Sequence, residues 1–246
     1  LGGSKETEKA VRRALDWFTR NQEEDGHWNR NGGHDVAATG MAMLAYMGWG
    51  AKHIDDSGPY QKQLAKAMKW MLREEKNKNG DLRGPHPGDM YDHGIAAIAM
   101  AEAYALTKDP DLKPVVERIV KFTVDAQNPK TGGWRYKPYG DWPKREKADM
   151  SVTGWQIMAL KSAEMGGIKV SQVAFQRAAR YLNKGSRGGG YSYQSGGEPN
   201  PAMTAEGMFC RQLLGGLFPP DHHRMRERAQ FIQSKLPSHR NENYYY

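Results

Sequence analysis

Hydrophobic residues recur along the chain with the period of amphipathic helices. Near the N-terminus, Val11, Leu15 and Phe18 lie at helical spacing with charged residues between them, which predicts a helix with one buried face. Segments of the same kind occur at 59–76, 111–127, 170–184 and 221–236. Segments that are apolar on most sides lie between them, at 36–46, 95–105, 152–163 and 203–214. Because a helix that is apolar all round belongs inside a protein, the pattern predicts an all-α chain in which outer and inner helices alternate.

Two short phrases repeat with a period of about fifty residues. The first is an aromatic anchor near the end of each outer helix, followed by a glycine-containing loop; the anchors are Trp17, Trp70, Phe122, Tyr181 and Phe231. The second places a glycine one turn into each inner helix, at Gly40, Gly94, Gly154 and Gly207. Since both phrases share one period, we interpret the chain as a single domain, 1–246, of helix hairpins. The units span about 4–52, 59–108, 111–167 and 170–216, with a partial fifth at 221–246.

The repeated glycines indicate how the hairpins are arranged. Glycine inside a helix costs about 1 kcal/mol relative to alanine, so four recurrences suggest that inner helices approach each other closely. A tight inner ring would require this, and we therefore expect an α/α toroid of outer/inner hairpins, with an open solenoid as the alternative. In the loops, we expect Gln22 and Gln127 to brace each outer helix to the next unit through free backbone groups.

These phrases carry a resemblance to a known family. Gln22-Glu-Glu-Asp25-Gly26-His-Trp28 resembles the glutamine–tryptophan repeat of squalene–hopene and oxidosqualene cyclases. The phrase from Asp149 to Gln156 is similar to that of bacterial prenyltransferase/squalene-oxidase-repeat proteins. The resemblance implies an α/α toroid with a central apolar cavity that binds a hydrophobic, isoprenoid-like molecule.

The catalytic motif of those cyclases is incomplete. The resemblance places an Asp-x-Asp-Asp motif at Glu146-Lys147-Ala148-Asp149, where Ala148 occupies the position of the acid. No Asp-rich metal motif, paired Cys/His spacing or thioester phrase occurs, so we expect no metal and no cofactor. The single cysteine, Cys210, is expected to be a buried structural thiol. The sequence leaves open whether the protein is an enzyme.

Carboxylates at the starts of the inner helices are the candidate site. Asp35, Asp89 and Asp149 share one position in the repeat, where a carboxylate either caps the helix or lines the mouth of a central cavity. The catalytic candidates are Asp149, His93 and Asp35. The ligand-binding candidates are Asp89, Asp92, Tyr91, Trp155, Glu206 and His34. Methionines on the inner helices, Met41, Met43, Met158 and Met208, are either plain core or the lining of an apolar pocket.

The net charge and the hydropathy of the chain limit the classes of binding partner that we expect. The formal net charge is +8, which permits weak attraction to nucleic acid, anionic lipid or an acidic partner. Two basic clusters, at 144–147 and 224–228, lack the interleaved aromatics of single-strand binders, so we expect no nucleic-acid partner. No run of 18 apolar residues occurs, which excludes a membrane-spanning helix. Leu1 to Lys9 lack the apolar centre of a secretory signal; a membrane surface stays a candidate partner, and the compartment stays open.

Three functional hypotheses follow. The leading one is a toroid that binds a hydrophobic, isoprenoid-like small molecule. The second is a non-catalytic scaffold that binds protein or glycan. The third is a carboxylate-based glycan-active enzyme, because paired carboxyl groups at the mouth of an α/α barrel suit glycoside chemistry.

The chain ends inside a repeat. The fifth unit has an outer helix and then reaches Tyr244, Tyr245 and Tyr246 without an inner helix. We therefore expect the native protein to continue beyond Tyr246. A ring that lacks one inner helix would expose apolar faces through which it could form an oligomer.

Overall fold

The computed structural model describes residues 3–29, 33–54, 58–75, 79–84, 88–143, 146–187, 189–215 and 222–235. The chain divides into two compact units. Unit 1 comprises 1–122 and 162–169, and unit 2 comprises 123–161 and 170–246. The single domain expected over the whole chain stays a prediction, and Tyr244–Tyr246 lie outside the described residues.

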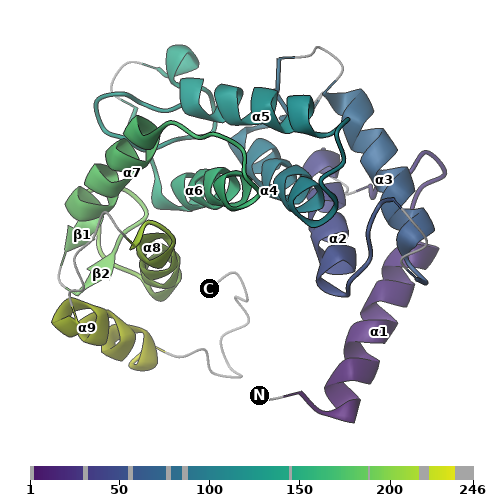
Figure 1. Cartoon of the computed structure of the whole chain (residues 1–246). Helices are drawn as coiled ribbons and strands as arrows, with labels where there is room; N and C mark the ends of the chain where they lie inside the picture. Colours follow the sequence, from purple (N-terminus) through teal and green to yellow (C-terminus); the bar gives the residue numbers. More distant parts are fainter. Residues whose placement is uncertain are drawn as a thin grey trace. The chain divides into compact units, whose positions relative to one another are not determined.

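Nine α-helices lie within the described residues, which confirms the predicted all-α class (Figure 1). They are α1 (Lys5–Arg20), α2 (Asp35–Gly48), α3 (Gln61–Glu74), α4 (Met90–Thr107), α5 (Lys113–Asp125), α6 (Met150–Met165), α7 (Gln172–Gly185), α8 (Pro201–Leu213) and α9 (His222–Gln233). One 3₁₀ turn (Tyr139–Asp141) and two antiparallel two-residue strands, β1 (Ser186–Arg187) and β2 (Gly190–Tyr191), complete the elements. The inner helix α4 buries thirteen of its residues, whereas the outer helix α1 buries only Leu15, so the alternation is as predicted.

Glutamines at the ends of two outer helices tie each helix to the next one. Gln22 Nε2 donates to the carbonyl oxygen of Gly26 at 2.8 Å and to that of Gln63 in α3 at 2.9 Å. Gln127 Nε2 donates in the same way to Gly132, at 2.9 Å, and to Ala174 in α7, at 3.0 Å. Each amide thus fixes its own loop and the following outer helix, which confirms the predicted brace.

The joint after α3 uses a carboxylate instead. Glu75 is buried, and its Oε1 accepts a hydrogen bond from the Gly80 backbone N–H at 3.0 Å. Arg118 of α5 donates to both oxygens of Glu75, at 2.9 and 2.7 Å. A bidentate pair with arginine gives this joint both charge neutralisation and a fixed geometry.

A glycine in each of these joints has a left-handed backbone; the three are Gly26, Gly80 and Gly132. Gly132 has a φ of 86°, and a Cβ placed on it would overlap the carbonyl oxygen of Arg177 in α7. Only glycine adopts this conformation readily and also lets the next outer helix approach so closely.

The glycines within the inner helices do not share one role. A Cβ on Gly40 would lie 3.2 Å from the Ala96 Cα, so α2 packs closely on α4 as expected. Gly154 leaves room for the side chain of Glu206, and Gly207 leaves room for the ring of Tyr191. Close helix approach therefore explains the first of these glycines and side-chain packing the other two.

The feature that the four inner helices share is a side-chain hydrogen-bond acceptor one turn after the helix start. The hydroxyls of Thr39, Thr153 and Thr204 accept from the backbone N–H groups of Trp28, Trp134 and Tyr191. His93 Nδ1 accepts from Leu82 N in the same way. Since Asn200 caps α8, the fourth unit starts two residues earlier than the glycine alignment implied, and Asn200 takes the place of Asp149.

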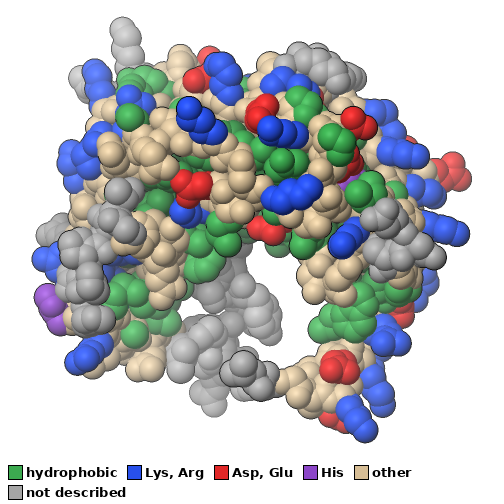
Figure 2. Space-filling model, viewed as in Figure 1, with side chains coloured by type: hydrophobic (Ala, Val, Ile, Leu, Met, Phe, Trp, Pro, Cys, Tyr) green, Lys and Arg blue, Asp and Glu red, His purple; other side chains and the backbone are tan. Residues whose placement is uncertain are grey.

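One arginine of the basic cluster at 224–228 is buried. Figure 2 shows Lys and Arg side chains over much of the face drawn, but Arg228 of α9 is only 2% exposed. Its Nη2 donates to Ser186 Oγ at 2.7 Å, and its guanidinium lies over the Tyr191 ring. Within the described residues, no helix is long and apolar enough to cross a membrane.

Candidate active site

A buried carboxylate at the start of α6 is held by several donors in unit 2. Asp149 is fully buried, and its Oδ1 accepts from Val152 N at 2.8 Å and from Ser151 Oγ at 3.1 Å. These bonds are those of a helix cap, and Asp89 Oδ1 similarly accepts from Tyr91 N at the start of α4. The capping interpretation is therefore confirmed for Asp89 and Asp149.

Arg135 joins the two acidic residues of the segment before α6. Its Nη1 donates to Asp149 Oδ2 at 3.0 Å, and its Nε donates to Glu146 Oε1. Burial raises the pKa of Asp149, while the bonds to the helix start and the charge of Arg135 oppose that rise. The segment that was matched to the cyclase motif is thus an ion-pair cluster around Arg135.

Two tyrosines extend the cluster toward solvent. The hydroxyl of Tyr193 lies 3.4 Å from Asp149 Oδ2 and hydrogen-bonds the hydroxyl of Tyr136. Tyr193 is 36% exposed. Burial and the bond to Tyr136 raise the pKa of Tyr193, so the Tyr193 phenol is a neutral hydrogen-bonding group near pH 7.

Glu206 supplies a second carboxyl group from α8. Its side chain lies over Gly154 of α6 and is partly exposed. Burial and then the negative charge of Asp149 raise the pKa of Glu206 to about 9. Glu206 therefore carries a proton at neutral pH, and it lies within the electrostatic influence of Asp149, whose own pKa burial raises and Arg135 lowers. Two carboxyl groups in such different environments are suited to separate acid and base roles.

A different set of predicted residues comes together in unit 1. His34, before α2, contacts Asp92 of α4, with 2.8 Å between Nδ1 and Oδ2. The backbone N–H groups of Ala37 and Asp89 also donate to the Asp92 carboxylate, both at 3.2 Å. Burial raises the pKa of Asp89, and the charge of Asp92 adds to the rise.

His93 has a different environment from its sequence neighbour Asp92. It is fully buried, its ring packs on Phe122, and its Nδ1 accepts from Leu82 N. Burial lowers the pKa of His93 to about 4. His93 therefore takes the structural place of the repeated threonines, and it lies in unit 1, whereas Asp149 lies in unit 2.

The remaining predicted residues make no comparable cluster in the contacts described. Asp35 and Trp155 are partly exposed, and their roles stay predictions.

Cys210 is buried and unpaired by any disulfide, as expected, and burial raises its pKa. Among the described residues, no group of three His, Cys, Asp or Glu side chains is placed to hold a metal ion. Sequence analysis missed Arg135, Tyr136 and Tyr193, since they lie in loops without a repeated signal.

Comparison with known proteins shows similarity in fold only. No family model and no curated protein matches the sequence. Among solved structures, a polysaccharide lyase has a TM-score of 0.65 at 12% identity, covering 94% of this chain and 72% of the other. The unsaturated glucuronyl hydrolase of Bacillus sp. GL1 has a TM-score of 0.60 at 13% identity, covering 96% and 69%. A protein from Actinoplanes has a TM-score of 0.57 at 16% identity, covering 94% and 66%.

These neighbours correct the earlier interpretation. The resemblance to squalene–hopene cyclases and prenyltransferase-repeat proteins was wrong, and so was the inferred isoprenoid-like ligand. The glutamine–glycine–tryptophan phrase builds the joint between helix hairpins, so it predicts the fold of the chain and does not identify a ligand or a reaction. Of the inner-helix methionines, Met43 is fully buried, as the core alternative implied, and Met41 is 49% exposed. What this chain shares with the lyase and the hydrolase is the α/α-toroid fold that its repeat predicted.

Proposed function

We propose that unit 2 carries an enzyme site that cleaves glycosidic bonds in an acidic glycan, with Glu206 as the proton donor. The proposal is supported by two carboxyl groups of unit 2, the buried Asp149 at the start of α6 and Glu206, which lies over Gly154 of the same helix and whose pKa burial raises to about 9. A carboxylic acid that keeps its proton at neutral pH is what a departing sugar oxygen requires.

The chemistry needs one proton at the leaving oxygen. As the bond between carbon and the glycosidic oxygen breaks, the electron pair stays on oxygen, and the proton moves from Glu206 to that oxygen. This step is common to hydrolysis, in which water adds to the sugar, and to elimination, in which a neighbouring C–H proton is lost. The Tyr136–Tyr193 hydroxyl pair, exposed on one side, offers hydrogen bonds to sugar hydroxyls, and aromatic rings offer apolar faces to a sugar.

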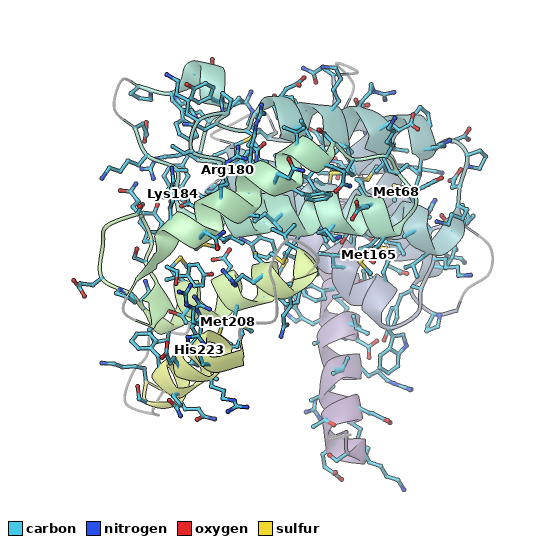
Figure 3. The ribbon with its side chains drawn as sticks, turned by 60° about the vertical axis from the view of Figure 1, so that its left-hand side comes forward. Met68, Met165, Arg180, Lys184, Met208 and His223 are labelled. Carbon is cyan, nitrogen blue, oxygen red and sulfur yellow. The ribbon has the colours of Figure 1, made fainter. Side chains whose placement is uncertain are left out.

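The distribution of charge supports an acidic glycan. Unit 2 holds 17 Lys and Arg against 9 Asp and Glu, whereas unit 1 holds 19 of each. The whole excess of positive charge therefore belongs to the unit that carries the site. Arg180 and Lys184 along α7 are exposed members of this set (Figure 3). Such a field attracts a polyanion and speeds its association at low ionic strength. The fold neighbours named for polysaccharide and glucuronyl substrates agree with this choice.

A panel of uronate-containing and neutral polysaccharides tests the proposal. Turnover is followed by the release of reducing ends and by the ultraviolet absorbance of an unsaturated uronyl product, so that hydrolysis and elimination are separated. We expect cleavage of an acidic member, and a loss of roughly 100-fold or more in kcat for Glu206→Gln. The matched control is Glu198→Gln, which changes an exposed glutamate in unit 2, and this variant should keep full activity.

Two results would overturn the proposal. Cleavage that survives Glu206→Gln unchanged would show that the proton comes from another group. Binding of acidic glycans without any cleavage, at every pH and with every member of the panel, would instead support the non-catalytic scaffold.

A further inference from the structure

The joint that follows α7 differs from the three joints before it. Each joint has a glycine with a positive φ, two residues before the backbone N–H that bonds to the inner-helix acceptor; these glycines are Gly26, Gly80, Gly132 and Gly189. A Cβ placed on any of the first three would overlap a backbone carbonyl oxygen of the next outer helix. No described atom lies within 4 Å of a Cβ placed on Gly189. The fourth joint is therefore open where the other three are closed.

The side chain at the end of α7 explains this difference. Five residues after the aromatic anchor, the first three joints have long side chains that bond to the next outer helix, those of Gln22, Glu75 and Gln127. The fourth joint has the short Ser186 at this position. The bond is made from the opposite direction, because Arg228 of α9 donates to Ser186 Oγ at 2.7 Å. A short side chain on one element and a long one on the other connect α7 to α9 while the loop glycine stays uncovered.

A groove of about 580 Å³ lies at this fourth joint. It is lined by Gly189 of the loop and by four residues at the spacing of one helix face, along α9 and its C-terminal end: Glu227, Gln230, Phe231 and Ser234. Helix α9 packs beside β2 here (Figure 1). All of these residues belong to unit 2. The volume is within the range of sites that bind small ligands.

The lining of the groove is suited to a sugar. Phe231 is partly exposed, and an aromatic ring offers an apolar face to the C–H groups of a sugar ring. Gln230 and Glu227 are exposed; the amide both donates and accepts hydrogen bonds, and the carboxylate accepts them, as sugar hydroxyl groups require. Because a carboxylate repels a second carboxylate, Glu227 favours an uncharged sugar residue over a uronate.

We propose that this groove is a second glycan-binding site of unit 2, which holds an uncharged sugar residue of the glycan that Asp149 and Glu206 act on. The choice of a glycan rests on the proposed function, whereas the position of the site and its preference for hydroxyl groups over carboxylates follow from the groove itself. Two contacts with one polymer raise its apparent affinity through effective concentration. The groove should therefore strengthen the binding of long chains more than that of short ones.

Nuclear magnetic resonance of the full chain with Glu206→Gln tests binding without turnover. Cellohexaose, a neutral β-linked glucose oligomer, is added to about 10 mM, which nearly saturates a site with a Kd of about 1 mM. We expect the backbone amide signals of Gly189 and Gln230 to shift and that of Gly140, in an exposed turn of unit 2, to stay unchanged. Unchanged signals at Gly189 and Gln230 would overturn this proposal even if the enzyme cleaves acidic glycans. If the signals shift but no polysaccharide is cleaved, only the proposed function fails.

Matched variants of one helix test the lining. Gln230→Ala removes a hydrogen-bonding side chain and should raise the Kd for cellohexaose about 3- to 10-fold. Gln233→Ala changes an exposed glutamine of the same helix that does not line the groove, and it should leave the Kd unchanged. Phe231→Ala should raise the Kd about 10-fold, and Phe231→Tyr, which keeps the ring, should bind as wild type. Equal effects of the two glutamine variants would refute the site.

The charge of Glu227 gives a separate test of the ligand class. A glucuronate oligomer of the same length should bind more weakly than cellohexaose, and Glu227→Gln should reduce this difference. Equal affinity of wild type for both oligomers would refute the preference for an uncharged sugar. Shifts of the Gly189 and Gln230 signals with oligolysine, and with neither oligomer, would assign the groove to a protein partner and overturn the proposal.

Discussion

Replacing Glu206 by glutamine should stabilise the protein while abolishing its proposed activity. The folded state holds the carboxyl proton up to a pKa of about 9, whereas the unfolded chain releases it near the ordinary value of 4.5. Since the folded state binds more protons, stability falls as the pH rises from about 4.5 to about 9 and is constant above that. Glutamine does not titrate, so the variant escapes this loss.

The magnitude follows from the pKa difference. Each pH unit above 4.5 removes about 1.4 kcal/mol from the free energy of unfolding, which gives an upper value of about 3 kcal/mol at pH 7. Because Glu206 is partly exposed, solvent screening reduces this to about 1–2 kcal/mol. Urea unfolding of wild type and Glu206→Gln at about pH 5, 7 and 9 measures it. A stability difference that does not grow with pH would refute the assigned environment of Glu206, and a variant less stable at every pH would do the same.

Three further changes probe the joints and the site. Gly132→Ala forces a left-handed alanine against a backbone carbonyl and should lower the thermal midpoint sharply, whereas Gly140→Ala, in open space, should change it little. Gln127→Ala removes two buried hydrogen bonds and should lower the free energy of unfolding by about 1–3 kcal/mol, measured with urea against exposed Gln176→Ala. Arg135→Met leaves a buried carboxylate without its cation and should cost about 3–5 kcal/mol at pH 7, and less near pH 4 by the same assay.

The architecture was predictable because its determinants are local and repeated. The spacing of apolar residues defines each helix, and the brace made by Gln22 and Gln127 stands at one repeated position, after an outer helix. Glu75 shows that the same joint forms with a different residue. A pattern that recurs about every fifty residues therefore indicates packing contacts that all the hairpins have in common.

The site was only partly predictable because its residues come from unrepeated segments. Asp149 and Glu206 were predicted from their positions at the starts of inner helices. The alignment of the glycines gave the fourth unit the wrong register, because Gly207 makes room for the ring of Tyr191 and does not mark a close approach of two helices. Arg135 and Tyr193 reach Asp149 only through the folding of two loops. His93 looked chemically active in the sequence, yet its ring replaces a threonine hydroxyl as an acceptor.

The braces between successive outer helices also affect how the protein unfolds. Each one connects neighbours along the chain, α1 with α3, α3 with α5 and α5 with α7. Stability in such a chain depends on the intrinsic stability of each hairpin and on its coupling to the next one, as in a one-dimensional array. Weakening the Gln127 joint should therefore let the hairpins after it open while those before it stay folded, and amide hydrogen exchange would record a step in protection between α5 and α7.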